Sequence, residues 1–595
     1  MKDSNLRTDQ LYEQISAYPK PPMASIPNAG ALLDELNISR NHWYGRLVTF
    51  LVVDRSGFRA FLQRHPEQLE TILRNTYLRG GGAKGPTISA TLSIIDDTRN
   101  LPAVSRAGAL VMAAIDLHKD ISSGKLAADN HRGQTMEMGQ YPNLFSTKFV
   151  VEKNGPMRLY KTKHHSHMIV IVANRFYKVE IDGLQLEGGS ERLDHTLKAI
   201  VANARSCRLD SVKFSPGVFT CCNERLQRAG FDSLNENGAN HAALDAIKHS
   251  FLTLCLDLDD RPITDADALR MAHSLNPGNR WHYSSMQIVV FGNAKTSIIY
   301  SFDAYLDGNV MARSAAELAR RSLKFGPKTM AKSDCASEGR FTKLRWQIPP
   351  NLFRRAHQSL RLVQDSQAAT YTILGIGRTV FDRYAINSVS AFVIALAQTA
   401  RQITGQIPQI IQLVNMSNFR CMGFKRVNSV TQAVVAFLEY TRDGDFEIGA
   451  ASKLLKLAAE SQQRLIKQNR TTLSAIELFN IFRNSITGLH RQYVRVICTL
   501  AALIGTLTRS VSLAGSDIII SHPAIFPEVS LVGRPGIRVS YAKYFALHYQ
   551  IFDEHIILTV MPGTHWATSN SELAAILELN LRSLCSILTD STRLS

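Results

Sequence analysis

The sequence predicts an α/β protein built from two packed domains. The chain has 595 residues, 45% of them hydrophobic and 20% charged, which is enough for more than one hydrophobic core. Apolar runs rich in β-branched and aromatic residues predict strands, as at 286–291 and 296–302. Apolar residues spaced by three or four positions predict helices, as at 243–254.

The first hundred residues are predicted to form an extended lead followed by helices. Prolines between positions 19 and 27 fix the backbone in an extended form, and apolar spacing between 29 and 78 indicates amphipathic helices. Residues 79–86 contain a GxGxxG pattern, but it follows a helical pattern instead of a strand, and Pro86 interrupts the helix that would hold a phosphate. We therefore interpret this segment as a flexible loop.

The middle of the chain is organised around a predicted hairpin. Gly292 and Asn293 supply a turn between the two apolar runs at 286–291 and 296–302. The second strand leads into Asp303 and Asp307, two carboxylates four residues apart, and an apolar stripe after residue 309 predicts a helix. A polar, glycine-containing connection at 330–345 indicates a domain boundary.

Several of these segments resemble the choline/carnitine O-acyltransferase family, which is part of the chloramphenicol-acetyltransferase-like superfamily. Asn279-Arg280-Trp281 stands where the family has Asn-Arg-Trp, and Asp307-Gly308 stands where it has Asp-Gly. Residues 139–147 resemble the family's Gln-Tyr segment, and the order of segments is kept from about 139 to 311. The resemblance implies mixed sheets covered by helices, with an active-site tunnel at the domain interface.

The resemblance also implies how the chain divides. Residues 1–100 would be a lead and helices that pack with the second half, 101–340 the first acyltransferase-like half, and 341–595 the second. In the second half, a strand and glycine turn before Arg378 are similar to the family segment that holds coenzyme A phosphates through lysines, so Arg378 is the candidate phosphate ligand. The family's carnitine-carboxylate set is absent from 410–428, which predicts that carnitine is not the substrate.

The candidate catalytic residues depart from the family pattern. The family's general base is a histidine, and with Asp307-Gly308 as the anchor its place is taken by Asp303, whereas anchoring on Tyr300 would put Phe302 there. A carboxyl group is a weaker base than imidazole, with a reference pKa of about 3.9 against about 6.5, although burial beside Asp307 would raise it. Ser521 stands where the family has an oxyanion-stabilising serine, and His522 is a candidate displaced base, although a lone histidine is more often structural.

Charge and cysteine content limit the classes of partner. The formal net charge of +18 favours acidic partners, but the basic residues are dispersed and no aromatic-basic motif predicts nucleic-acid binding. The eight cysteines lack CxxC spacing, and no metal site is predicted. The polar N-terminus and the lack of a run of about 18 apolar residues predict a cytoplasmic protein without a membrane span.

Two functional classes remain open from the sequence. The first is an acyl-processing enzyme, most simply an acyltransferase, that uses a coenzyme A thioester or a carrier-bound phosphopantetheine thioester. Its candidate partner is an acidic acyl carrier protein, and no bound cofactor is expected. The second is a non-catalytic homologue that binds an acyl ligand or scaffolds a complex. Convergence of Asp303, Asp307, Ser521 and His522 on one tunnel would favour the enzyme, whereas a tunnel plugged by Phe302 or Tyr305 would favour the binder.

Overall fold

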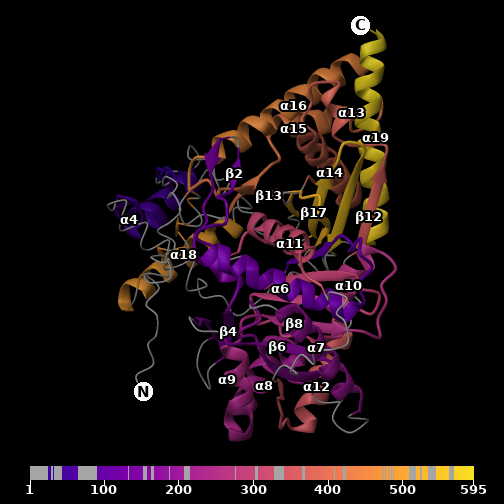
Figure 1. The fold of residues 1–595 in the computed structure, drawn as a ribbon. Helices are drawn as coiled ribbons and strands as arrows, with labels where there is room; N and C mark the ends of the chain where they lie inside the picture. The colour runs from indigo at the N-terminus through magenta and orange to yellow at the C-terminus, as the bar shows by residue number, and fades with distance from the viewer. Residues whose placement is uncertain are drawn as a thin grey trace.

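The structure is a computed structural model of the full chain. It describes residues 24–28, 31–32, 43–63, 90–131, 133–151, 157–162, 166–185, 188–206, 215–274, 276–301, 306–326, 341–364, 369–407, 409–419, 424–473, 475, 478–479, 482–483, 486, 488–507, 518–522, 525–533, 545–561 and 568–594. Two sheets, each covered by helices, form its two halves (Figure 1). This arrangement confirms the predicted fold class of mixed sheets covered by helices.

The larger sheet of the described chain has eight strands in the order β11-β7-β6-β8-β9-β10-β1-β16. β6, β8 and β9 are parallel neighbours, and the other neighbouring pairs are antiparallel. The predicted hairpin is confirmed as the β9–β10 pair. The strands are β1 (Ala90–Ile94), β6 (His167–Val172), β7 (Arg175–Glu180), β8 (Thr253–Asp257), β9 (Met286–Phe291), β10 (Thr296–Tyr300), β11 (Phe341–Lys343) and β16 (Val529–Gly533).

Helices and short elements from the same part of the chain accompany this sheet. Among them α6 and α11 pack against each other, and both contact strands of the sheet. The longer helices are α6 (Ala103–Ser122), α7 (Gly189–Ser206), α8 (Glu224–Glu236), α9 (His241–Lys248), α10 (Asp265–Ser274), α11 (Gly308–Ser322) and α12 (Pro350–Gln364). The shorter elements are β2 (Asn130–His131), β3 (Gln134–Thr135), η3 (Tyr141–Leu144), β4 (Thr147–Val151), β5 (Met157–Lys161), η4 (Pro216–Thr220), η5 (Gly238–Asn240) and η6 (Pro277–Asn279).

The second sheet of the described residues has six strands in the order β12-β18-β17-β15-β13-β14, and β13, β15 and β17 are parallel neighbours. Its strands are β12 (Ala369–Leu374), β13 (Ile410–Asn415), β14 (Phe424–Asn428), β15 (Ile518–Ser521), β17 (Phe545–Ile551) and β18 (His555–Met561). The accompanying helices are α13 (Arg378–Asp382), α14 (Ser388–Thr404), α15 (Gln432–Tyr440), α16 (Ile448–Asn469) and α19 (Asn570–Leu594). α14 begins at an Asn387 side-chain cap and ends at Gly405, whose positive φ of 73° suits glycine.

One strand links the two sheets. β16 comes from the last part of the sequence, yet it pairs with β1 at the edge of the larger sheet. The carbonyl oxygen of Val532 on β16 accepts a hydrogen bond of 3.4 Å from Thr559 on β18. β1 from the predicted 1–100 segment and β16 from the predicted 341–595 half thus share the larger sheet, and the domain division itself stays a prediction.

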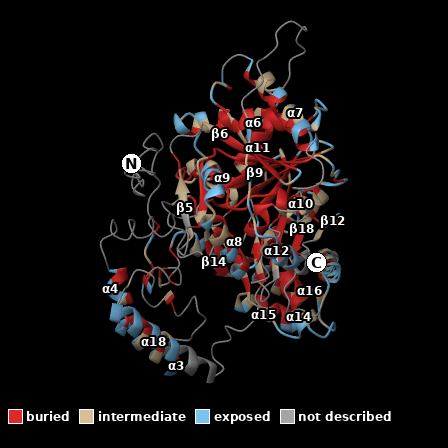
Figure 2. Ribbon diagram, turned by 90° about the horizontal axis from the view of Figure 1, so that it is seen from below, coloured by how far each residue is buried: buried red, intermediate tan, exposed pale blue. Residues whose placement is uncertain are grey.

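A smaller group of helices lies to one side of the two sheets. It comprises α3 (Trp43–Val48), the π-helical segment η1 (Thr49–Arg55), α4 (Phe58–Leu62) and α18 (Gly488–Leu507). The rings of Phe58 and Phe61 pack on the ring of Phe482, with centroids 5.8 and 5.4 Å from its centroid. Figure 2 shows that exposed residues predominate in this group, whereas the sheets are buried. The predicted loop at 79–86 lies outside the described residues.

A buried ion pair fixes the start of the hairpin. Arg280 and Asp257 both have side chains that are 0% exposed, and Nη2 of Arg280 lies 2.6 Å from Oδ2 of Asp257. Asn279 donates to the same carboxylate at 2.6 Å. The Asn-Arg part of the Asn279-Arg280-Trp281 segment therefore ties the chain just before β9 to the end of β8.

Candidate active site

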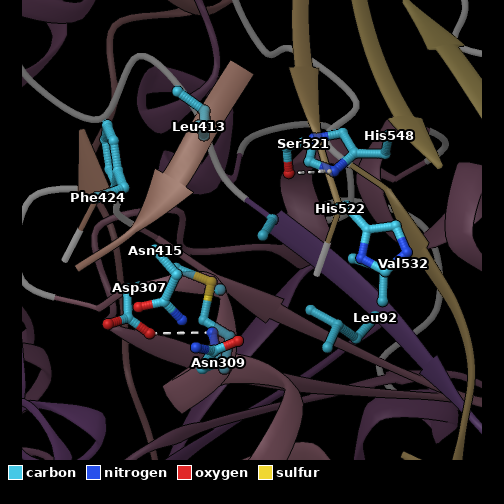
Figure 3. Close-up of a pocket in the computed structure, with 13 residues that line it drawn as sticks. Leu92, Asp307, Asn309, Leu413, Asn415, Phe424, Ser521, His522, Val532 and His548 are labelled. Carbon is cyan, nitrogen blue, oxygen red and sulfur yellow. Dashed lines mark hydrogen bonds between the residues drawn. The ribbon is translucent and has the colours of Figure 1, made fainter. Parts of the chain in front are cut away.

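A pocket of about 60 Å³ is lined by residues from both sheets (Figure 3). The larger-sheet half contributes strands β1 and β16 and the start of α11, and the other half contributes β13, β14, β15, β17 and the residue after β15. The lining residues are Ala90, Leu92, Asp307, Gly308, Asn309, Met311, Leu413, Asn415, Phe424, Ser521, His522, Val532 and His548. A site between the two halves is where the sequence places the active-site tunnel.

Asp307 borders this pocket as the N-terminal cap of α11. Its Oδ1 accepts hydrogen bonds from the backbone N–H groups of Asn309 at 2.9 Å and Val310 at 3.0 Å. Its Oδ2 accepts from Nε2 of Gln140 at 3.2 Å, while Oε1 of Gln140 accepts from the Asp307 backbone N–H at 2.7 Å. Asp307 therefore holds the start of α11 in place, a role that suits an aspartate at this position.

The ionisation of Asp307 reflects two opposing influences. Burial raises the pKa of this carboxyl, while the hydrogen bonds from Val310, Asn309 and Gln140 lower it, and the net result is a pKa of about 6. Burial dominates because the side chain has lost most of its contact with water. Both oxygens already accept hydrogen bonds from the protein, which favours a positioning role for Asp307 over proton transfer to substrate.

Ser521 and His548 form a side-chain pair on the opposite wall. β15 and β17 run parallel, and Ser521 and His548 are register partners, so their side chains leave the sheet on the same face. Oγ of Ser521 lies 3.1 Å from Nδ1 of His548 (Figure 3). His548 is 5% exposed, and Ser521 is half-buried. A hydroxyl within hydrogen-bond reach of an imidazole is the arrangement that activates a serine for attack.

His522 borders the same pocket but differs from His548 in its surroundings. Its ring packs edge-on against Tyr549, with ring centroids 5.1 Å apart. Burial lowers its pKa to about 4, and the charge of Arg378 acts in the same direction. The residue keeps exposed surface, even though protein surrounds its imidazole closely enough to disfavour the charged form. His522 is therefore neutral at neutral pH and a weak base.

Arg378 does not line the pocket. It begins α13, where its backbone N–H donates to the carbonyl oxygen of Phe552 at 2.8 Å. Its guanidinium donates to the carbonyl oxygen of Ile551 at 3.3 Å and lies 3.6 Å from Asp553. The side chain is 52% exposed, so it remains accessible to a phosphate group from solvent.

The structure brings together three of the four predicted catalytic residues. Asp307, Ser521 and His522 line one pocket, whereas Asp303, Phe302 and Tyr305 lie outside the described residues. Sequence reasoning missed Gln140 and His548. The signal for His548 was weak, because the residue is one polar position in an alternating strand and nothing local pairs it with Ser521.

The described residues contain no cluster of three or more His, Cys, Asp or Glu side chains placed to hold a metal ion. Cysteines 221, 222, 255, 498 and 585 are free thiols in the structure. Burial raises the pKa of Cys255 to about 12, so it is a thiol at neutral pH and has no nucleophilic character. Within the same residues, no helix combines the length and apolarity needed to cross a membrane.

The model of the Choline/Carnitine o-acyltransferase family matches residues 64–478. The chain belongs to the choline/carnitine O-acyltransferase family. This membership confirms the resemblance inferred from the sequence, and the fold class that came with it.

The curated relatives that the chain matches are distant in sequence. The chain is 23% identical to a choline O-acetyltransferase of Mus musculus over 58% of this chain and 55% of the relative. It is 22% identical to a carnitine O-acetyltransferase of Mus musculus over 60% of this chain and 58% of the relative. It also matches a highly reducing polyketide synthase of Aspergillus luteorubrus, at 23% identity over 61% of this chain and 11% of the synthase. The chain thus spans little more than half the length of the two acetyltransferases.

Proposed function

We propose that the protein transfers an acyl group from a coenzyme A or acyl-carrier-protein thioester to a hydroxyl acceptor other than carnitine. The observation that carries this proposal is the convergence of Ser521, His548 and the start of α11 on one pocket between the two sheets. Acyl transfer needs a base near a hydroxyl and groups that stabilise a tetrahedral oxyanion. The residues of this pocket supply both kinds of group.

The base is assigned to His548. His522 is a weaker candidate because its pKa is lowered to about 4, far below the operating pH at which a base works best. Asn309, at the N-terminal end of α11, also lines the pocket, and its side-chain amide is a hydrogen-bond donor for the negative charge that develops on the carbonyl oxygen. Asp303 remains a predicted second base.

The choice of a thioester donor is supported by charge. The net charge of +18 would concentrate the phosphates of coenzyme A or an acidic carrier protein near the surface. Arg378 offers an exposed guanidinium after β12, and arginine binds phosphate in a two-point geometry. The match to part of a highly reducing polyketide synthase favours a carrier-bound donor as well as coenzyme A.

The acceptor side of the pocket argues against carnitine. β13 and β14 present Leu413, Asn415 and Phe424 to the pocket, and none of these side chains carries a positive charge. Among the described residues that line the pocket there is no lysine or arginine to pair with a carnitine carboxylate. A neutral alcohol or an apolar hydroxylated molecule suits these walls better.

The test is a panel of acyl-coenzyme A and acyl-carrier-protein thioesters of increasing chain length, each offered with a set of alcohols and with carnitine. Free thiol release and product mass are followed for the wild type, His548→Gln, Asp303→Asn and a control, His555→Gln, whose ring stacks on Phe552 away from the pocket. We expect release with neutral alcohols that falls 100-fold or more in His548→Gln and stays unchanged in the control. Thioester binding without release in the wild type would instead establish a non-catalytic homologue.

A further inference from the structure

We propose that Ser521 is the nucleophile of the reaction, so that the acyl group passes through an ester on Ser521 with His548 as the proton carrier. This inference rests on the proposed acyl transfer, and it changes the route. Instead of the acceptor attacking the thioester directly, the donor acylates the protein first and the acceptor then removes the acyl group. Such a route has its own covalent intermediate, which can be isolated.

The geometry of the pair is the first argument. The 3.1 Å separation of Oγ and Nδ1 is a hydrogen bond, and in the tautomer protonated on Nε2 the serine hydroxyl donates to Nδ1. The bond joins neighbouring parallel strands inside one sheet, so backbone pairing fixes the relative positions of the two side chains. His548 is buried, whereas Ser521 keeps part of its surface and borders the pocket. Ser521 is thus the more accessible member of the pair, and both side chains border the pocket.

The other polar groups of the pocket are less suited to the nucleophilic role. Asp307 uses both carboxylate oxygens to accept hydrogen bonds from its own helix and from Gln140. Oδ1 of Asn415 accepts from the backbone N–H of Ser417 at 2.7 Å, and an amide is a poor nucleophile. Ser521 is the hydroxyl among the lining residues, and it has an imidazole beside it.

The two half-reactions balance without any further reagent. In the first, Oγ of Ser521 attacks the thioester carbonyl carbon, its proton moves to Nδ1 of His548, the C–S bond breaks and the leaving thiolate takes that proton. In the second, the acceptor hydroxyl attacks the Ser521 ester and gives its proton to His548. The bond between Oγ and the acyl carbon then breaks, and Oγ recovers the proton. The products are a free thiol and the acylated acceptor.

The experiment combines intact mass with two chemical probes. Wild type is mixed with butyryl-coenzyme A without acceptor, quenched in acid and analysed by intact mass and peptide mapping, and a second sample is treated with a fluorophosphonate that labels activated serines. The variants are Ser521→Ala, Ser521→Cys and His548→Gln. The matched control is Ser530→Ala on β16, whose hydroxyl donates to Ser93 at 3.1 Å and does not line the pocket.

We expect a butyryl adduct and a fluorophosphonate label on the Ser521 peptide of the wild type and the control. Both should be absent from Ser521→Ala and at least 100-fold slower to form in His548→Gln. Ser521→Cys should regain a butyryl adduct, as a thioester that hydroxylamine removes, which also shows that the variant is folded.

The contrary outcomes separate this inference from the proposed function. Turnover that persists within about threefold in Ser521→Ala, with no adduct in the wild type, overturns the acyl-serine and leaves acyl transfer standing by direct attack. If no donor gives thiol release, the proposed acyl transfer is wrong. The fluorophosphonate then tests, independently of any thioester, whether Ser521 is an activated nucleophile. Labelling of Ser521 that depends on His548 upholds an activated serine, and an unlabelled Ser521 rules it out.

Discussion

Replacing Arg280 by methionine tests the reasoning about how the hairpin is anchored. The substitution removes the guanidinium but keeps a long apolar side chain of similar reach. It leaves the buried Asp257 carboxylate without the contacts to Nη1 at 3.1 Å and Nη2 at 2.6 Å. It also removes the bonds from Arg280 to the carbonyl oxygens of Ala272 at 2.5 Å and Asn279 at 3.0 Å.

The expected cost follows from what remains. Asp257 keeps the hydrogen bond from the neutral amide of Asn279. Its buried negative charge, however, has lost the positive charge of Arg280. Breaking a buried ion pair on one side costs about 3–5 kcal/mol, because the remaining charge is uncompensated. This corresponds to a roughly 100- to 4,000-fold increase in the equilibrium constant for unfolding.

Urea unfolding followed by tryptophan fluorescence measures this loss. Trp281 is next to the substituted residue and packs edge-on against Phe231, with centroids 5.8 Å apart, so it reports on this part of the larger-sheet half. The matched control is Arg320→Met, because Arg320 is 51% exposed and pairs with Glu528 at the surface. Its loss should be below about 1 kcal/mol.

A second variant separates the charge from the packing. Arg280→Met combined with Asp257→Leu removes both charges, and it should recover much of the stability lost in the single variant. If Arg280→Met is destabilised no more than Arg320→Met, the ion pair does not anchor the hairpin. If the double variant is as unstable as the single one, the lost carbonyl contacts of Arg280 account for the effect, and the uncompensated charge does not.

Three further predictions concern pH, backbone packing and phosphate binding. Burial alone would raise the pKa of Asp97, but hydrogen bonds from Arg99 and the charges of Arg106 and Arg99 lower it from 3.8 to about 2. Asp97 should therefore contribute about 2 kcal/mol of stability above pH 4, and this contribution should be lost as the pH falls toward 2. Urea unfolding at several pH values should show this loss in the wild type and not in Asp97→Asn. Gly377→Ala would place a Cβ 2.3 Å from a backbone oxygen, so its thermal midpoint should fall, whereas Gly238→Ala meets nothing within 4 Å and should melt as wild type. Arg378→Met should raise KM for coenzyme A thioesters about tenfold with kcat retained, and an unchanged KM would exclude a phosphate contact.

The parts of the fold that could be predicted are those that depend on neighbouring residues. The β9–β10 hairpin follows from two apolar runs around a glycine turn, and the start of α11 follows Asp307 because an aspartate caps the helix that it precedes. The role of the Asn279-Arg280 pair was not foreseen. Its side chains bind an aspartate at the end of an earlier strand, and sequence spacing gives no measure of that contact.

The candidate site was predicted in part for the same reason. Three site residues were identified one at a time, each from its own segment: Asp307, Ser521 and His522. In the structure all three line one pocket. His548 was missed because its pairing with Ser521 depends on the register of two parallel strands separated by residues 522–544. A shift of one residue in that register would turn His548 to the other face, so only the folded sheet reveals the pair.

The position of this histidine changes the chemistry that follows from it. In the family pattern the base comes from the segment before Asp-Gly and acts on the acceptor, whereas His548 comes from the opposite half and contacts a serine on its own sheet. A base takes its proton from the hydroxyl that it contacts, so the proposed route begins with the proton of Ser521. The histidine expected from the family is missing from its place, and in the proposed route a base on the neighbouring strand would make Ser521, which stands where the family has an oxyanion-stabilising serine, the attacking group.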